Sequence, residues 1–215
     1  MICAIVVAAG SGTRFGGRKQ FIEVAGRSVV AWSIAACRSV ASQVVVVVPA
    51  DIAPEDLPAD LQADVVVVGG ATRADSVRAG LASIHPHATC IVVHDAARPV
   101  AGPALFQAVT EAIAQGAAAA ICATDVTDTV KVVARRDGRS IVVDTLDRSS
   151  LVAVQTPQAF TPEILRAAHA SGGDATDDAG LVEALGETVV VVPGSPSNVK
   201  ITNASDLDLI RASLS

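Results

Sequence analysis

Apolar positions along the chain follow two spacings that alternate from one end to the other. Short uninterrupted runs of apolar, largely β-branched residues predict strands covered on both faces, as in a mostly parallel sheet. Between these runs apolar residues recur every three or four positions, which is typical of amphipathic helices. The predicted strands cover residues 2–8, 44–48, 65–68, 90–94, 118–123 and 188–192. The predicted helices lie at residues 30–37, 77–84, 105–113, 179–185 and 205–214.

This alternation predicts an α/β fold with a doubly wound, mostly parallel, Rossmann-like sheet. The chain has 215 residues, which fits a single domain over residues 1–215. One segment departs from the pattern, because residues 128–136 and 139–145 are β-rich and flank Asp137-Gly138. An Asp-Gly pair between two strands strongly indicates a hairpin. We therefore predict an antiparallel β-hairpin arm at about residues 128–149, inserted in the parallel fold.

Composition narrows the function classes. Aromatic residues are scarce, with four Phe, one Trp and no Tyr, and the formal net charge is −6. Both features argue against a nucleic-acid-binding surface, which needs stacking rings and cations. The four cysteines have no metal-binding spacing, so we expect reduced thiols and a cytoplasmic protein. We also expect no signal peptide and no membrane association, because the chain starts on a predicted strand and lacks a long apolar stretch.

A glycine-rich loop, A-G-S-G-T-R-F-G-G-R-K, follows the first predicted strand. Such loops bring backbone N–H groups close to phosphates. The dinucleotide pattern is incomplete because Phe15 stands where its third glycine belongs, although Asp51 keeps that interpretation open. The P-loop pattern fails because Arg18 and Lys19 follow its second glycine, with no hydroxyl for magnesium. Arg14 and Lys19 remain as two cations suited to stabilising charge on a triphosphate.

Two further segments join predicted strands to helices. In the turn at residues 69–76, Thr72 is expected to cap a helix together with Asp75, and the Gly-Gly pair before it would let a flat ligand such as a base approach closely. Asp95 and Arg98 follow a central strand at its carboxyl end, where open α/β sheets bind ligands.

The C-terminal part offers Lys200, the only lysine beyond residue 131, in an extended stretch before the last helix. Thr176 is interpreted as a helix N-cap. The four histidines show no metal-ligand spacing and are expected at loop, strand-end and helix-surface positions. They are His85, His87, His94 and His169.

Taken in order, these motifs resemble one family, the 2-C-methyl-D-erythritol 4-phosphate cytidylyltransferases of the non-mevalonate isoprenoid pathway. The similarity runs from residue 2 to about residue 209. It implies a nucleotidyltransferase fold and a reaction in which CTP and 2-C-methyl-D-erythritol 4-phosphate give 4-diphosphocytidyl-2-C-methyl-D-erythritol and pyrophosphate. A ribitol-5-phosphate cytidylyltransferase and, more remotely, an NAD(P)-binding oxidoreductase are the alternatives. The matching motifs are A-A-G-S-G-T-R-F, R-K-Q-F, G-G-x-x-R-x-D-S-V, V-H-D-A-A-R-P, D-T-V-K, V-Q-T-P-Q-A-F, T-D-D-A and N-V-K-I-T.

The same resemblance implies roles for individual residues. The catalytic cations are Arg14, Lys19, Arg148 and Lys200. The nucleotide-binding residues are Ala8, Ala9, Gly10, Gly12, Arg14, Lys19, Gly70, Ser76, Asp95, Ala96 and Lys200. The acceptor-binding residues are Asp95, Arg98, Thr129, Arg148 and Thr156. Magnesium is expected on the CTP phosphates and water, with no dedicated protein site.

A homodimer is expected through the hairpin arm, because two strands alone cannot bury its apolar residues. Within the family, the arm crosses a two-fold axis, which would put Thr129 and Arg148 in the partner's active site. The first loop departs from the family, since only four residues separate Arg14 from Lys19. The loop is then either looser before substrate binds or assisted by Arg18. Ala71 stands where some members carry a polar residue near the base.

Overall fold

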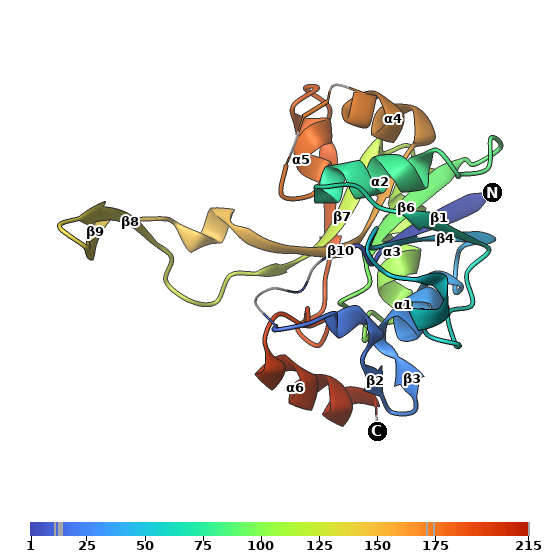
Figure 1. Ribbon diagram of the computed structural model, residues 1–215. Coiled ribbons are helices and arrows are strands. Elements are labelled where there is room, and N and C mark those ends of the chain that lie inside the picture. The colour runs from blue at the N-terminus through green and yellow to red at the C-terminus, as the bar shows by residue number, and fades with distance from the viewer. Residues whose placement is uncertain (11, 13–14, 171, 174, 215) are drawn as a thin grey trace.

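A seven-stranded sheet forms the centre of the molecule, in the order β11-β7-β10-β6-β1-β4-β5 (Figure 1). The computed structural model describes residues 1–10, 12, 15–170, 172–173 and 175–214. The neighbouring strands β6, β1, β4 and β5 are all parallel, as are β11 and β7, which confirms the predicted mostly parallel sheet. The strands are β1 (Ile2–Val7), β4 (Gln43–Val48), β5 (Val65–Val68), β6 (Cys90–Asp95), β7 (Ala119–Asp125), β10 (Val152–Phe160) and β11 (Val189–Pro193).

Strand β10 was not predicted, and it lies antiparallel between β6 and β7. Its sequence, VAVQTPQAF, contains a proline, which cannot donate to a ladder hydrogen bond, and it lacks a clear apolar pattern. The pairing with β7 accommodates this by a register shift between Val154 and Gln158. The irregularity brings the Thr156-Pro157 segment, which has a cis peptide bond, next to the end of β6.

Helices cover both faces of the sheet, as a doubly wound fold requires. On one face α1 (Val29–Cys37) and α3 (Pro103–Ala114) pack around Phe106, which is fully buried. On the other face α2 (Arg73–Leu81), α4 (Pro162–Ala170) and α5 (Asp178–Glu183) pack around Phe160 and Leu165. Helix α4 was not predicted, whereas the other helices overlap the ranges that the spacing predicted.

The last helix, α6 (Ala204–Leu214), lies away from the sheet against the short strand β2 (Glu23–Val24), which pairs with β3 (Arg27–Ser28) (Figure 1). A small cluster of buried side chains, including Val24 and Ile210, joins them. Short 3-10 helices occur at η1 (Lys19–Phe21), η2 (Pro54–Asp56) and η3 (Arg148–Ser150). Neither the β2–β3 hairpin nor η1, which carries Lys19, was predicted.

The hairpin arm forms as predicted, from β8 (Lys131–Arg136) paired antiparallel with β9 (Arg139–Thr145). Asp137 and Gly138 have φ of 50° and 74°, the positive values that the tightest hairpin turns require. The arm projects from the body of the domain, and every residue of β9 is exposed (Figure 1). Its apolar side chains therefore do not pack on their own domain.

All four cysteines are buried, as expected for small apolar residues, and none forms a disulfide. Burial raises the pKa of the Cys90 thiol to about 11. Among the helices that the structure describes, none has the length and apolarity needed to cross a membrane.

Candidate active site

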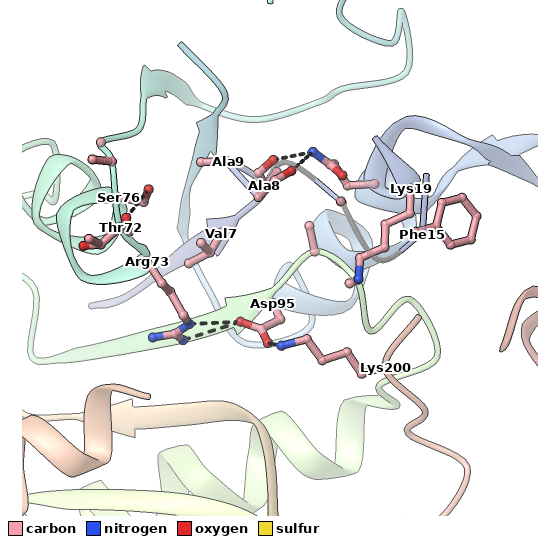
Figure 2. Close-up of a pocket in the computed structure, with 17 residues that line it drawn as sticks. Val7, Ala8, Ala9, Phe15, Lys19, Thr72, Arg73, Ser76, Asp95 and Lys200 are labelled. Carbon is pink, nitrogen blue, oxygen red and sulfur yellow. Dashed lines mark hydrogen bonds and ion pairs between the residues drawn. The ribbon is translucent and has the colours of Figure 1, made fainter. Parts of the chain in front are cut away.

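A cavity of about 430 Å³ opens at the carboxyl ends of β1 and β6, beside the start of α2 (Figure 2). This is the edge at which open α/β sheets bind ligands. Of the predicted nucleotide-binding residues, Arg14 lies outside the described residues, and all the others line the cavity. They are Ala8, Ala9, Gly10, Gly12, Lys19, Gly70, Ser76, Asp95, Ala96 and Lys200.

Gln20 holds the first loop in place. Its side-chain amide donates to the carbonyl oxygens of Ala8, at 2.7 Å, and of Gly10, at 3.0 Å, and only 3% of the residue is exposed. A Cβ added to Gly10 would meet nothing within 4 Å, so this glycine faces open space. Gly12 has φ of +67°, and a Cβ there would lie 1.9 Å from the Gly17 carbonyl oxygen. At Gly12 the loop therefore packs against its own backbone, whereas at Gly10 it is open.

No role was predicted for Gln20 from sequence, although the residue stands directly after Lys19. Arg18, in contrast, points away: it forms an ion pair with Asp51 at 2.7 Å, and neither of the two lines the cavity. Arg18 is therefore not placed to share the work of Lys19. The same pair weakens the dinucleotide interpretation, because Asp51 would have to reach a ribose in this cavity.

The Gly69-Gly70 turn has a packing role that the sequence did not suggest, and Gly70 also lines the cavity, where the approach of a base stays a prediction. A Cβ on Gly70 would lie 2.3 Å from the Cβ of Asp75, and one on Gly69 would lie 2.6 Å from the Cβ of Ala9. Both glycines are required by packing within the protein. Thr72 and Asp75 form the predicted capping box, with the Thr72 hydroxyl accepting from the Asp75 N–H at 3.0 Å.

Asp95 is the electrostatic centre of the site, at the carboxyl end of β6. Lys200 approaches one carboxylate oxygen at 2.5 Å, and Arg73 approaches the other at 3.4 Å (Figure 2). Burial by itself would raise the pKa of Asp95, but the charges of Lys200 and Arg73 lower that pKa well below its usual range. The carboxylate is therefore ionised and held between two cations.

Arg73 belongs to the G-G-x-x-R-x-D-S-V motif, but the sequence predicted no role for it. Its guanidinium also forms an ion pair with Asp178 at 2.8 Å, and the side chain of Asp178 is fully buried. The other oxygen of Asp178 lies 2.9 Å from Nε2 of His169, which is buried and not on the helix surface as expected. The start of α5 thereby anchors Arg73 toward Asp95.

The N-cap of α5 is not the residue predicted from the sequence. Asp177, not Thr176, accepts from the Gly180 N–H, at 3.1 Å, with its other oxygen 2.7 Å from the Gln158 amide. Asp and Thr are both good N-caps, and the sequence T-D-D offers three candidates in a row. Only the position of the helix in the fold decides between them.

A second cavity of about 380 Å³ adjoins the first and shares the wall made by Arg73, Asp95 and Lys200. Two further predicted acceptor residues, Arg98 and Thr156, line it. The structure thus places the predicted nucleotide and acceptor groups in two neighbouring spaces with a common charged boundary.

Arg98 gives the second cavity a partly buried cation. One guanidinium nitrogen donates to the Asn198 carbonyl oxygen at 2.7 Å, and Nε is buried without a hydrogen-bond partner. Burial lowers the pKa of Arg98, because desolvation disfavours the charged form. An anion entering this cavity would compensate that cost.

Thr129 and Arg148 are not brought into either cavity. Both are exposed at the base of the arm, where the Arg148 guanidinium donates to the Thr127 carbonyl oxygen. Within one chain, these two predicted acceptor-binding residues therefore stand apart from the rest.

His94 is at a strand end as expected, but it is wholly buried. Its Nδ1 lies 3.2 Å from the Thr156 hydroxyl, and its Nε2 lies 3.2 Å from the Arg98 carbonyl oxygen. No role was predicted for His94, although it belongs to the V-H-D-A-A-R-P motif, because its contact with Thr156 comes from a distant segment of the chain.

Comparison with known proteins agrees with this geometry. The sequence model of the family described as 2-C-methyl-D-erythritol 4-phosphate cytidylyltransferase matches residues 2–215. A protein of that name from Nocardia farcinica is 44% identical over 214 residues, covering 97% of this chain and 91% of the relative. A bifunctional enzyme IspD/IspF from an Anaeromyxobacter species is 45% identical, and the chain spans 57% of that longer protein.

Solved structures give the same result. The crystal structure of 2-C-methyl-D-erythritol 4-phosphate cytidylyltransferase from Thermus thermophilus superimposes with a TM-score of 0.81 at 36% identity. The superposition covers 97% of this chain and 96% of that one, so the likeness extends over nearly the whole fold. The chain belongs to the 2-C-methyl-D-erythritol 4-phosphate cytidylyltransferases, a family of nucleotidyltransferases.

Proposed function

We propose that this cytidylyltransferase binds CTP in the first cavity and 2-C-methyl-D-erythritol 4-phosphate in the second, and transfers the cytidylyl group across their shared wall. The observation that carries this assignment is the wall itself, in which Asp95 holds Lys200 on one side and Arg73 on the other. A cation at the boundary serves both substrates, because the nucleotide phosphates and the acceptor phosphate must meet there.

The reaction is an in-line displacement. An oxygen of the acceptor phosphate forms a bond to the α-phosphorus of CTP, and the bond from that phosphorus to the oxygen of the leaving pyrophosphate breaks. The attacking phosphate is already anionic, so the reaction needs no general base. Lys19 and Arg14 stabilise charge on the nucleotide phosphates, and Lys200 holds the acceptor against them. Catalysis then consists of positioning and electrostatic stabilisation.

Magnesium is proposed to reach the site on CTP. Among the described residues, no group of three or more His, Cys, Asp and Glu side chains is placed to hold a metal ion. Asp95 has a cation near each of its carboxylate oxygens, which leaves phosphates and water as the main ligands. Bound in this way, the ion would neutralise phosphate charge. Chelation by EDTA should abolish turnover and leave the folded state unchanged by circular dichroism.

The active enzyme is proposed to be a homodimer in which the arm of each chain completes the site of the other. Support comes from the exposed apolar residues of the arm and from the finding that Thr129 and Arg148 line neither cavity. We further propose that the enzyme works in the cytoplasm, where its four buried thiols remain reduced.

The test of composite sites mixes a Lys19→Ala chain with an Arg148→Ala chain. In the mixed dimer, one site contains both substitutions and the other contains neither, so random exchange should restore about a quarter of wild-type turnover. A mixture that stays as inactive as its parents, after subunit exchange has been shown by mass spectrometry, would exclude the shared-site arrangement.

The substrate assignment is tested by measuring pyrophosphate release from CTP, UTP, ATP and GTP with each of several polyol phosphates. We expect release with CTP and 2-C-methyl-D-erythritol 4-phosphate. Faster release with ribitol 5-phosphate would favour the ribitol-5-phosphate alternative, and comparable rates with purine triphosphates would contradict the nucleotide assignment.

A further inference from the structure

His94 contacts three residues of the acceptor side without lining either cavity. It precedes Asp95 in β6, and its ring nitrogens meet Thr156 and the backbone of Arg98. The ring is fully buried against Phe106, with ring centroids 5.0 Å apart. A histidine in this place cannot touch a substrate, so any effect on the reaction must pass through its neighbours.

The hydrogen bonds determine which nitrogen carries the proton. The Arg98 carbonyl oxygen can only accept, so Nε2 of His94, 3.2 Å away, must donate. Burial lowers the pKa of His94 to about 4, which keeps the ring neutral. Nδ1 is therefore an acceptor, and the hydroxyl of Thr156, at 3.2 Å, donates to it.

The Thr156 hydroxyl therefore uses its proton in a hydrogen bond within the protein. While it donates to His94, its oxygen accepts from the Asp95 N–H at 3.0 Å. Its single proton is used, so it has none to offer a phosphate in the second cavity. The backbone N–H of Arg98 in turn donates to the Asp95 carbonyl oxygen at 3.0 Å, which closes the turn between these two residues.

We propose that His94 is a positioning residue for the acceptor: it holds Thr156 and the Asp95–Arg98 turn so that the Asp95 carboxylate and the Arg98 guanidinium keep their places around the second cavity. In this arrangement Thr156 supports Asp95 and does not donate to the acceptor phosphate. The inference rests on the proposed division of substrates between the cavities. Its physical basis is that small displacements of positioning groups cost up to about a hundredfold in rate.

Two substitutions separate the two hydrogen bonds of the ring. His94→Gln places an amide near Nε2, which keeps the donor to Arg98 and removes the acceptor for Thr156. His94→Asn places its oxygen near Nδ1, which keeps the acceptor and removes the donor. Each should raise the acceptor KM about tenfold, as for the loss of one buried hydrogen bond, with the CTP KM changed less than about twofold. His87→Gln and His87→Asn, at an exposed loop position before β6, are the matched controls and should change neither constant.

A purely structural role would lower the melting temperature without separating the two KM values. Equal rises in both KM values, or no change in either, would overturn the proposal. Wild-type chain that releases no pyrophosphate would instead refute the proposed function. In that case, ¹⁵N NMR of the imidazole still tests the geometry: we expect a proton on Nε2 and none on Nδ1, and the opposite tautomer would contradict it.

A substitution of Thr156 tests the same proposal without altering the buried imidazole of His94. Thr156→Val removes the hydroxyl and should reproduce the rise in acceptor KM. If Thr156 acts through His94, the double variant with His94→Gln should be no worse than either single variant. If Thr156 donates directly to the acceptor, the two effects should multiply, and the positioning proposal fails.

Discussion

Strand β6 and strand β9 have similar apolar residues but opposite surroundings. All six residues of β6 are buried, whereas all seven residues of β9 are exposed. The sequences CIVVHD and RSIVVDT both centre on an isoleucine and two valines. In β6 these side chains are covered by helices on both faces, and in β9 they lie on a two-stranded ribbon with no cover from the same chain. The same residue types thus form a core in one place and an unpartnered surface in the other.

The largest difference should appear in an identical substitution made in both strands. Ile91→Ala in β6, where the residue is 0% exposed, should lower the free energy of unfolding by roughly 2–5 kcal/mol, because it leaves a cavity in the core. Ile141→Ala in β9, where the residue is 43% exposed, should change the free energy of unfolding of the isolated chain by less than about 0.5 kcal/mol. Urea unfolding at low protein concentration compares the two. Similar losses would mean that the arm packs on its own domain.

Next in size is the effect of the loop cation on turnover. Lys19→Ala should lower kcat by roughly 10²–10³, the scale for losing one contact to the transition state, with little change in melting temperature. Arg211→Ala, on the exposed side of α6, is the control for removing a cation and should leave kcat unchanged. A Lys19→Ala enzyme with near-normal kcat would remove the basis for assigning the first cavity to the triphosphate.

The third effect is the pH dependence of the free energy of unfolding, which His94 at the buried end of β6 should cause. Burial, the main cause, lowers the pKa of His94 from 6.5 to about 4. The charge of Asp95 and the hydrogen bond to the Arg98 backbone oppose this shift, and the charges of Arg98 and Lys200 add to it. Between pH 6.5 and 4 the unfolded chain binds a proton here that the folded chain does not, so stability falls as the pH falls through this window. The full loss amounts to about 3 kcal/mol. Urea unfolding at several pH values should show a smaller loss for His94→Gln than for wild type, and equal slopes would contradict the shift.

The smallest effect should come from the turn of the arm. Gly138 has φ of +74°, and a Cβ there would meet nothing within 4 Å, so Gly138→Ala adds backbone strain but no clash. We expect a cost of roughly 1 kcal/mol, seen as weaker dimerisation in analytical ultracentrifugation and not as a lower unfolding temperature of the monomer. A change in monomer unfolding with unchanged dimerisation would show that the arm stabilises its own chain instead.

Much of the site was predictable because it depends on segments contiguous in the chain. The loop after β1, the capped turn before α2 and the end of β6 each carry their residues within a few positions, and the order of strands in an α/β fold brings them to one edge. The structure placed Lys19, Asp95 and Lys200 around one cavity, as the resemblance implied. Arg14 lies outside the described residues, so its position remains a prediction.

Other parts were not predictable, since they depend on contacts between distant segments. Gln20 supports the loop through carbonyl groups ten and twelve residues earlier. Arg73 is held by an ion pair with Asp178 in α5. His94 is hydrogen-bonded to Thr156 in β10, a strand that was not predicted because its proline interrupts the apolar pattern. None of these pairings has a local signal, because hydrogen bonding between distant residues leaves no periodicity.

The sequence by itself determined the parallel core, the hairpin with its Asp-Gly turn and the family of the enzyme, because β-branched runs, helical spacing and turn residues act locally. Tertiary structure alone decided that β10 runs antiparallel through the middle of the sheet and that Asp95 sits between two cations. It also decided that the apolar residues of the arm point away from their own domain. The physical reason is that burial and ion pairing depend on which surfaces meet in space, and segments far apart in the chain supply those surfaces.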